Sequence, residues 1–375
     1  MENNKWQKKS NFRLTRKKYI CIIFIIIVIS VILSKVFYEN ESAKITLEDL
    51  EIITSTEYSS YKYEYGILEK SFYDNFLVNG LVVTNLEELD DENLASGNDI
   101  LSESIGLMLL KALKDNDENA FKDTVNNIEL YFFNKNNLLK WKINMENTSD
   151  EAVVNASIDD LRVIKALFRA YEAWGNEIYL EKAINLGDNL YENCIENKSL
   201  LSYDDDDSPL AIWAYYDFQA MYYLSSYDDR WKIVIEEGIK SIKEKQVSNM
   251  PLYYMESNDE EYNSIENLIT LMHLYEVGIK DQSSIKFIEN ELENGAYYAK
   301  YNKSGIAISD IESPAIYGII AQIAKLDKNE KLYKLACEKM ILFQHKENDK
   351  HFGGYIDEET NISYSFDHLM SLLGF

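Results

Sequence analysis

Carboxylate side chains recur near the expected starts of helices along this chain. Glu103 follows Ser102, and Asp159 and Asp160 follow Ser157. Two carboxyl groups that face one cavity can hydrolyse a glycosidic bond, because one donates a proton while the other activates water. Aromatic faces stack on sugar rings, and four aromatic residues lie among these carboxylates: Trp141, Tyr203, Trp213 and Tyr216. The residue types therefore indicate a carbohydrate site.

Each of these carboxylates also has an ordinary structural explanation. Asp and Glu are favoured in the first turn of a helix, because the positive end of the helix dipole stabilises them. The acidic run at 204–207 is typical of a solvated loop, and it lacks the Gly and the distal Glu of a calcium-binding EF-hand loop. For any single carboxylate, a capping role therefore competes with a chemical one.

Metal and cofactor chemistry find little support in the sequence. The four histidines lack the spacing of a zinc site. The chain has no phosphate-binding loop, no dinucleotide-binding glycine motif and no nucleophile elbow. Three cysteines are too few for a disulfide scaffold, and the sequence leaves open whether Cys194 and Cys337 pair. We therefore expect no metal and no cofactor.

The elements that must position the carboxylates are helices, since apolar residues recur at helical spacing almost throughout 66–375. Val82-Val83-Thr84 is the only strand candidate. Serine is a favoured N-cap, and serines mark six expected starts, at 102, 157, 208, 264, 313 and 363, with proline following at 209 and 314. Second helices are expected near 117–132, 177–195, 229–245, 283–295 and 329–345. A helix at about 66–79 precedes them, and the last serine-started helix, at about 364–374, closes the chain, which makes twelve helices in six hairpins.

Two all-α architectures suit six hairpins that repeat about every 50 residues. They can stack into an open solenoid, or close into a ring, an (α/α)6 barrel, which needs no capping repeats. In a ring, the six serine-started helices form the inner layer and their N-termini converge on one face. An open array would instead suggest an interaction protein, for example one that holds a synthase complex together.

The charge of the chain is unevenly distributed. Residues 1–38 carry eight Lys or Arg and one Glu, a net +7, which leaves −33 for the rest of a chain whose total is −26. So acidic a chain is not expected to bind nucleic acid.

The apolar stretch 19–38 has the length of a membrane-spanning helix. The basic residues before it place the tail 1–18 in the cytoplasm, and residues 39–65 (a tether) and 66–375 (the barrel) outside the cell membrane. A cleaved signal peptide is the competing interpretation.

Two segments resemble a known family. The segment Asn155-Ala156-Ser157-Ile158-Asp159-Asp160-Leu161, followed by Ala166-Leu167, Ala170 and Trp174, resembles the signature of glycoside hydrolase family 8. Ser102-Glu103-Ser104 resembles its Ser-Glu-Gly-Gln segment, and the stretches 73–80 and 138–141 fit its neighbouring segments. In architecture the resemblance covers about residues 66–375. It implies an (α/α)6 barrel and an inverting hydrolase of β-1,4-linked glucans, xylans or chitosans.

The resemblance also assigns roles to individual residues. Glu103 matches the general acid, which needs a raised pKa at neutral pH. Asp160 matches the second signature aspartate, in the substrate-binding part of the cleft, whereas Ile158 replaces the first. The aspartate of the family's usual base segment is absent from 313–317, so the chain looks like a divergent branch. Asp217 is the first substitute for the base, followed by Asp310, Glu312 and Asp367.

We therefore expect a membrane-tethered, extracellular, inverting endo-glycosidase. Its substrate would be a β-linked polysaccharide, an exopolysaccharide or a β-1,4-glucan, and a neutral or cationic one because the outer part of the chain is strongly acidic. Asp160 would hold the sugar at the cleavage point, and Asp159 and Asp367 would bind it beside the four aromatic residues. The membrane and a polysaccharide synthase complex are candidate partners. A carbohydrate-binding protein on the same fold, without catalysis, is the alternative.

Overall fold

The computed structural model describes residues 46–87, 97, 99–144, 153–246, 261–357, 360 and 362–375. The predicted basic tail and membrane-spanning segment, and the first residues of the predicted tether, lie outside the described residues. Among the residues that are described, no helix has the length and apolar character needed to cross a membrane. The chain divides into two compact units, residues 1–48 and residues 49–375.

Twelve α-helices lie in the described part of residues 49–375, as the sequence predicts. Six of them form an inner layer: α3 (Ser102–Lys114), α5 (Ser157–Trp174), α7 (Phe218–Leu224), α9 (Ser264–Glu276), α11 (Pro314–Asp327) and α13 (Ser365–Gly374). Six form an outer layer: α2 (Lys62–Phe76), α4 (Glu118–Tyr131), α6 (Glu177–Cys194), α8 (Arg230–Lys245), α10 (Gln282–Asn294) and α12 (Glu330–Phe343). Short 3-10 helices occupy η1 (Leu47–Asp49) and η2 (Trp213–Tyr215).

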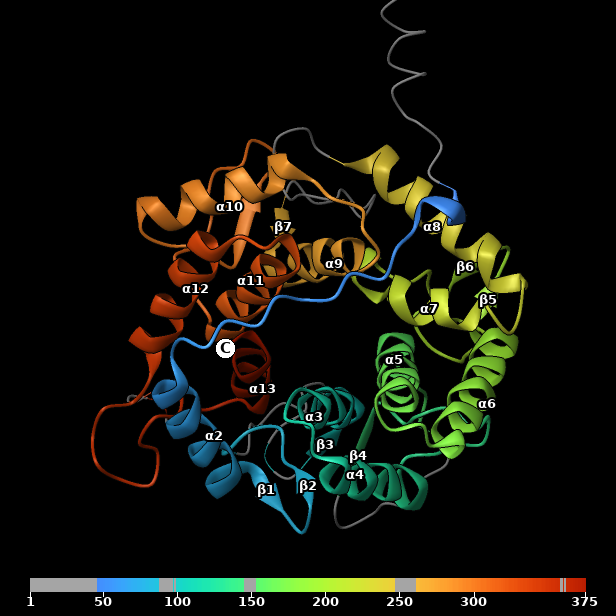
Figure 1. The fold of residues 1–375 in the computed structure, drawn as a ribbon, viewed down its shortest axis with the longest axis horizontal. Coiled ribbons are helices and arrows are strands. Elements are labelled where there is room, and N and C mark those ends of the chain that lie inside the picture. Colours follow the sequence, from blue (N-terminus) through green and yellow to red (C-terminus); the bar gives the residue numbers. More distant parts are fainter. Residues whose placement is uncertain are drawn as a thin grey trace, which may run out of the picture. The chain divides into compact units, whose positions relative to one another are not determined.

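The inner helices close into a ring. Each one packs on the next in the order α3, α5, α7, α9, α11 and α13, and α13 packs back on α3 (Figure 1). Outer helices cover this layer from outside, with α4 on α3, α6 on α5, α8 on α7 and α12 on α11. The first outer helix, α2, packs on the last inner helix, α13. This arrangement is an (α/α)6 barrel, and the open array considered from the sequence is wrong.

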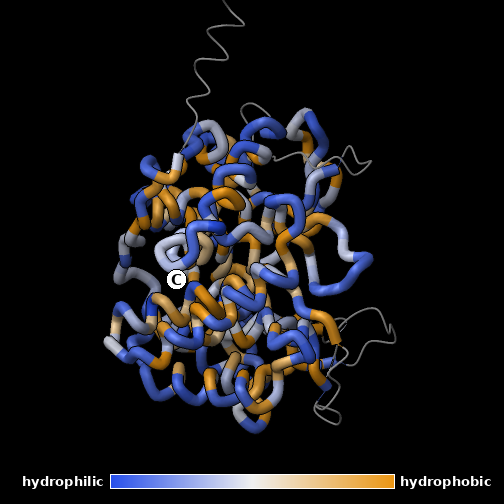
Figure 2. The backbone as a smooth tube through the Cα atoms, turned by 90° about the vertical axis from the view of Figure 1, so that its right-hand side faces the viewer, coloured by the Kyte–Doolittle hydropathy of each residue, from blue (hydrophilic) through white to orange (hydrophobic). Residues whose placement is uncertain are grey.

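The core lies between the two helical layers. Apolar and polar residues alternate within the helical turns, as helices that bury one face require (Figure 2). α11 and α13 approach especially closely, because Gly318 has no side chain and a Cβ there would lie 2.6 Å from the backbone of Met370. Cys194 and Cys337 are both buried and free, so they do not pair. Burial raises the pKa of each thiol to about 12.

Short paired strands connect the helices, and the sequence did not predict them beyond residues 82–84. Two of the pairs are hairpins, and in the other two a pair of helices separates the strands. Four two-stranded antiparallel sheets join β1 (Leu77–Val78) to β2 (Leu81–Val82), β3 (Asp99–Leu101) to β4 (Lys142–Asn144), β5 (Ile195–Glu196) to β6 (Ser199–Leu200), and β7 (Glu261–Asn263) to β8 (Lys300–Asn302). Strands of two or three residues are too short to show alternation. β3 leads directly into α3 and β7 into α9, so they fix where these helices begin.

Two of the six predicted inner-helix starts are wrong. The third inner helix begins at Phe218 rather than near Ser208, and the Asp217 carboxylate caps it by accepting from the Ala220 N–H at 3.0 Å. The last inner helix begins at Ser365, because the Ser363 hydroxyl instead donates to the Tyr355 carbonyl. The other four starts agree with the predicted serines to within one residue.

Residues 50–61, which we call the strap, run across the C-terminal ends of the inner helices (Figure 1, blue). The Ile53 N–H donates to the Glu276 carbonyl at 2.9 Å, at the end of α9. The Thr56 N–H donates to the Lys325 carbonyl at 3.0 Å, in the last turn of α11. The strap therefore packs on the barrel, and α2 begins at Lys62, four residues before the predicted start.

Candidate active site

Glu103 lies in the first turn of α3, immediately after strand β3. Its side chain is partly exposed. Burial raises the pKa of the Glu103 carboxyl to about 7; the Arg162 guanidinium opposes this rise and the Asp159 carboxylate adds to it. The raised pKa that the sequence analysis required of a general acid is therefore present. The catalytic role itself stays a prediction.

Asp159 connects the helix that carries Glu103 to its neighbour in the inner layer. It is buried in the first turn of α5, where its carboxylate accepts from the Ser102 hydroxyl at 2.6 Å and pairs with the Arg162 guanidinium at 2.5 Å. Gly106, one turn after Glu103, makes room for this pair, since a Cβ there would lie 2.9 Å from the Arg162 side chain. Asp159 therefore links the starts of α3 and α5, and holds Arg162 where it acts on Glu103.

Asp160, which the resemblance placed in the substrate-binding cleft, is completely buried. Its carboxylate accepts from the Leu139 N–H at 2.9 Å and from the Asn155 amide at 2.6 Å, and burial raises its pKa. These contacts give Asp160 a structural task, tying the loops before α5 together. Asp204 is also buried, and it accepts from the side-chain amide of Asn134 and the backbone N–H of Asn155, so the acidic run does not begin as a solvated loop.

Asp217, the first candidate for the base, is closed off from solvent. Its carboxylate lies 2.7 Å from the Lys165 amine and 3.6 Å from His273 Nε2. Although burial alone would raise the pKa of Asp217, Lys165 and then His273 hold it below its usual range. The Lys165 amine also pairs with Glu276 at 3.0 Å. Asp217 therefore belongs to a buried charge cluster inside the barrel.

This buried cluster has the composition of a metal site. Oxygen and nitrogen atoms of Asp217, His273 and Glu276 lie within 4.8 Å of one another. The Lys165 amine bonds both carboxylates, so an ammonium group already supplies the positive charge that a metal ion would bring. The donor set is therefore satisfied without a metal.

The remaining candidates for the base differ in their surroundings. Glu312 accepts from the Tyr317 hydroxyl and lies 3.3 Å from the Lys339 amine of the outer helix α12, so it is engaged with the outer layer. Asp367 accepts from the Ser313 hydroxyl at 2.6 Å and from the Ala315 N–H at 3.0 Å, which caps α11. Asp310 is exposed.

Tyr215 and Glu266 also lie near expected helix starts, but the sequence analysis gave them no role in the site. Burial raises the pKa of Tyr215, the negative charges of Asp159, Glu103 and Glu266 raise it further, and the Arg162 guanidinium lowers it. Glu266 is partly exposed in the first turn of α9, and burial raises its pKa. Glu266 follows Ser264 by two residues, the spacing that separates Ser157 from Asp159, so the sequence did carry a signal.

The predicted stacking residues divide into two groups. Trp141, Tyr203 and Trp213 are partly exposed. The Trp213 indole N–H is buried and has no acceptor among the described residues. Tyr216 is buried in the core instead: its hydroxyl accepts from the Leu200 N–H at 3.1 Å, and a Cβ at Gly238 would lie 2.8 Å from its ring. It therefore cannot serve as an open platform.

The fold and this site define a six-hairpin barrel of the glycosidase type, with acidic and aromatic residues where the inner helices begin. No protein-family model matches the chain. A solved structure described as a novel alpha-amylase from Clostridium perfringens is 30% identical, with a TM-score of 0.78, over 83% of this chain and 96% of that one. The "Putative lipoprotein YdaJ" of Bacillus subtilis is 27% identical over 294 residues, 73% of this chain and 78% of that protein.

The endo-beta-1,4-glucanase CMCax from Acetobacter xylinum is 15% identical with a TM-score of 0.58, over 83% of this chain and 97% of that one, which shows the shared fold alone. A cold-adapted family 8 xylanase also matches, with a TM-score of 0.60 and 13% identity, over 86% of this chain and 93% of that one. The chain thus belongs to the family of the Clostridium perfringens protein. It is a divergent chain with the fold of glycoside hydrolase family 8.

Proposed function

We propose that this protein is a glycoside hydrolase that is tethered outside the cell membrane and cleaves a polysaccharide. The observation that carries the proposal is the partly exposed carboxyl of Glu103, whose pKa burial raises to about 7. It lies at the end of the barrel where the inner helices begin, among Tyr215, Asp159 and Arg162. A carboxyl with this pKa is still largely protonated just below neutral pH, so it can protonate a leaving oxygen.

Glu266 is the proposed base, in place of Asp217 and Asp160. Both aspartates are engaged with buried partners, whereas Glu266 is partly exposed and, like Glu103, raises the pKa of Tyr215 through its charge. Glu103 and Glu266 come from different inner helices, α3 and α9, as two groups acting on opposite faces of a sugar require. The proposed outcome is hydrolysis with inversion at the anomeric carbon.

The substrate is proposed to be a neutral polysaccharide, since a chain of charge −26 repels anionic polymers. The structural neighbours at 13–15% identity include a β-1,4-glucanase and a xylanase. The relative at 30% identity is described as an alpha-amylase. The difference in identity makes an α-linked glucan the first substrate to test, beside the β-linked glucans expected from the sequence. Trp141, Tyr203 and Trp213 would stack on its rings.

The tether is proposed on the apolar stretch 19–38 and on the name of YdaJ, which is called a lipoprotein. Fractionation of cells that produce the full chain tests it. The protein should sediment with membranes, resist extraction by alkaline carbonate, and be degraded by a protease added to intact cells. Recovery of the intact chain from the culture medium would contradict the tether.

The activity is tested by counting new reducing ends. The purified full chain is incubated with starch, β-1,4-glucan, xylan and poly-N-acetylglucosamine, beside Glu103→Gln, Glu266→Gln and the control Glu261→Gln, which removes an exposed carboxylate close to Glu266 in sequence. We expect release by wild type and by the control only, with kcat/KM falling as the pH rises above about 7, where Glu103 loses its proton. Unchanged release by Glu103→Gln would contradict the assignment.

One observation favours a second candidate function, carbohydrate binding without hydrolysis. Asp159, Asp160 and Asp217 are all engaged with buried partners, so these three aspartates are unavailable as a base. Calorimetric titration with oligosaccharides distinguishes the two functions. Binding to one of the same glycans without any release of reducing ends, by wild type and by Glu266→Gln alike, would establish the binding function.

A further inference from the structure

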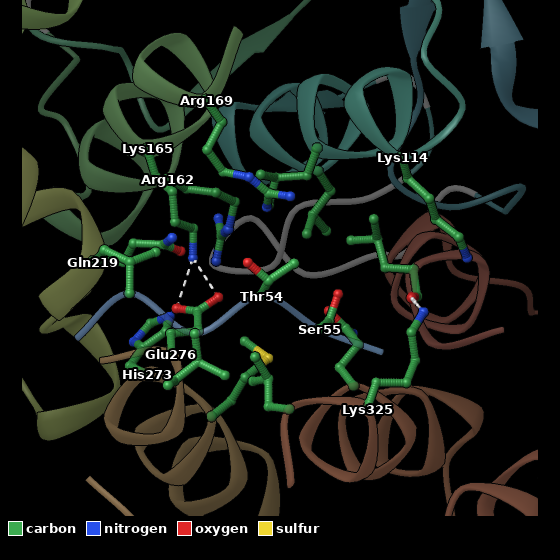
Figure 3. A pocket seen from close by; sticks show the side chains of 18 of the residues that line it. Thr54, Ser55, Lys114, Arg162, Lys165, Arg169, Gln219, His273, Glu276 and Lys325 are labelled. Atoms are coloured by element: carbon green, nitrogen blue, oxygen red, sulfur yellow. Dashed lines mark hydrogen bonds and ion pairs between the residues drawn. The ribbon is translucent and has the colours of Figure 1, made fainter. Parts of the chain in front are cut away.

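A cavity lies inside the barrel towards the end where the inner helices end, away from Glu103. Its volume is about 290 Å³, close to the lower end of the range for small-molecule sites. All six inner helices contribute to its wall, and strap residues 52–55 and Glu57 complete it. Figure 3 shows side chains from the surrounding helices reaching into this space, with Thr54 and Ser55 of the strap among them. We call it the inner cavity.

The inner cavity is rich in positive charge, although the chain as a whole carries −26. Five basic residues line it, against the three acidic residues Glu57, Glu172 and Glu276: Lys114, Arg162, Lys165, Arg169 and Lys325. A concentration of cations inside an acidic protein is unusual enough to require an explanation for each one.

Three of the five cations are matched by carboxylates. Arg162 pairs with Asp159 at 2.5 Å, Lys165 with Asp217 at 2.7 Å and with Glu276 at 3.0 Å, and Lys325 with Glu57 at 3.2 Å. These pairs account for the charge on the side of the cavity that faces the candidate active site and for part of the charge beneath the strap.

Lys114 and Arg169 are the other two cations. The Lys114 amine donates to the Leu372 carbonyl at 2.5 Å, which places it at the C-terminal end of α13. A carbonyl satisfies one N–H of the ammonium group but brings no full negative charge. Within the described part of the chain, neither Lys114 nor Arg169 has a carboxylate within ion-pair distance. Figure 3 shows the Arg169 side chain extending into the cavity.

Lys114 is partly buried, whereas Arg169 is exposed. Burial lowers the pKa of Lys114 to about 7, and the neighbouring Lys325 ammonium lowers it as well, so the charged form of Lys114 is costly without a counter-ion. A negatively charged group bound in the inner cavity would compensate Lys114, and Arg169 is a second lining cation that could contact it. Guanidinium groups bind carboxylates and phosphates with two parallel hydrogen bonds, and an ammonium group adds a point charge.

We propose that the inner cavity is a binding site for a small anion bearing a phosphate or a carboxylate, held by Lys114 and Arg169. The hydroxyls of Thr54 and Ser55 in the strap lie where they can hydrogen-bond such a ligand. A cation is excluded from the same space because Lys165 already occupies the position between Asp217 and Glu276. The proposal goes beyond the proposed function and does not depend on it.

The test measures the thermal unfolding midpoint of the full chain with increasing inorganic phosphate or sodium acetate, against sodium chloride of equal ionic strength. The site predicts a saturable rise of about 2–4 °C with the anion that fits. The rise should be lost in Lys114→Met and in Arg169→Gln, and kept in Lys240→Met, which removes an exposed cation of α8. Phosphate and acetate arms show which of the two groups the site accepts.

A second measurement needs no variant. At pH 7 a substantial fraction of Lys114 is the free amine, so a limiting amount of acetic anhydride should acetylate it faster than exposed lysines such as Lys240. Saturating anion should protect Lys114 and leave Lys240 unchanged, as read by mass spectrometry. Equal midpoints in all salts, equal rises in all variants, or Lys114 labelling that neither anion slows would each overturn the proposal.

Discussion

The two ends of the barrel use burial in opposite ways. Where the inner helices begin, burial raises the pKa of the Glu103 carboxyl to about 7. Where they end, it lowers the pKa of the Lys114 ammonium to about 7. The helix dipoles sort the two kinds of charge, because N-termini favour carboxylates and C-termini favour ammonium groups. The same desolvation thus favours the protonated carboxyl at one end and the deprotonated amine at the other.

Arg162 and Lys165 separate these two ends. They lie one turn apart on α5, and each is neutralised by carboxylates, Asp159 above and Asp217 with Glu276 below. Two unpaired cations buried one turn apart on one helix would be costly, and the carboxylates compensate each of them locally. The barrel interior can therefore hold an acidic and a basic site close together without the two neutralising each other.

The strongest test of the acidic end is Glu103→Gln. Hydrolysis should fall by about 10³-fold, since glutamine keeps the shape and loses the proton. The initial rate of reducing-end release on the preferred glycan measures it, and Glu261→Gln should keep full activity. A loss below tenfold would show that another group protonates the leaving oxygen.

Lys165→Met tests whether the Lys165 ion pairs stabilise the region between the two ends of the barrel. This change leaves Asp217 and Glu276 buried without their cation, so the free energy of unfolding should fall by about 3–5 kcal/mol. Urea unfolding at pH 7 measures it. The exposed control Lys240→Met should stay within about 0.5 kcal/mol of wild type. Adding Asp217→Asn to Lys165→Met should recover part of the loss, and no recovery would contradict the pairing.

The pH dependence of stability sharpens the comparison. The Glu103 carboxyl has an ordinary pKa of 4.5 and a folded pKa of about 7, so the folded protein binds its proton more tightly than the unfolded chain does. Wild type therefore loses stability as the pH rises from 4.5 through 7. Glu103→Gln avoids this loss, and its advantage should grow from near zero at pH 4 to about 1–3 kcal/mol at pH 8. A difference between the two proteins that is independent of pH would contradict the assigned pKa.

The smallest expected effect concerns the strap. Glu57→Gln removes the carboxylate that pairs with Lys325, but the Glu57 side chain is 61% exposed. Water screens such a pair, so the unfolding free energy should change by less than about 1 kcal/mol. Thermal unfolding at low and high salt measures it, and the difference from wild type should shrink as salt increases. A larger, salt-independent loss would mean that this ion pair, and not the backbone hydrogen bonds, holds the strap.

Helix periodicity made most of the fold predictable, because helices contain their own hydrogen bonds and bury one face. The third inner helix was misplaced because Ser208 followed by Pro209 has the local pattern of a helix start. In the structure Leu210 instead bridges to Leu201, and the capping group is Asp217. Local propensity could not reveal that this segment pairs with residues before it and that a later residue caps the helix.

The candidate site was less predictable than the fold. Glu103 could be found from its motif, since its environment follows from its place at a helix start. The partners of Asp160 are Leu139 and Asn155, and the ring of Tyr216 packs at Gly238. These contacts join separate parts of the chain, so the sequence alone could not show that they bury both side chains.

The ring closes through its earliest and latest helices, since α13 packs on both α2 and α3. During synthesis, α2 and α3 leave the ribosome roughly 250 residues before α13 does. Since synthesis adds about 5–20 residues per second, the apolar faces of α2 and α3 stay uncovered by α13 for many seconds. The nascent chain must therefore be shielded from aggregation until its final helix is complete, and the barrel cannot finish folding from its first half.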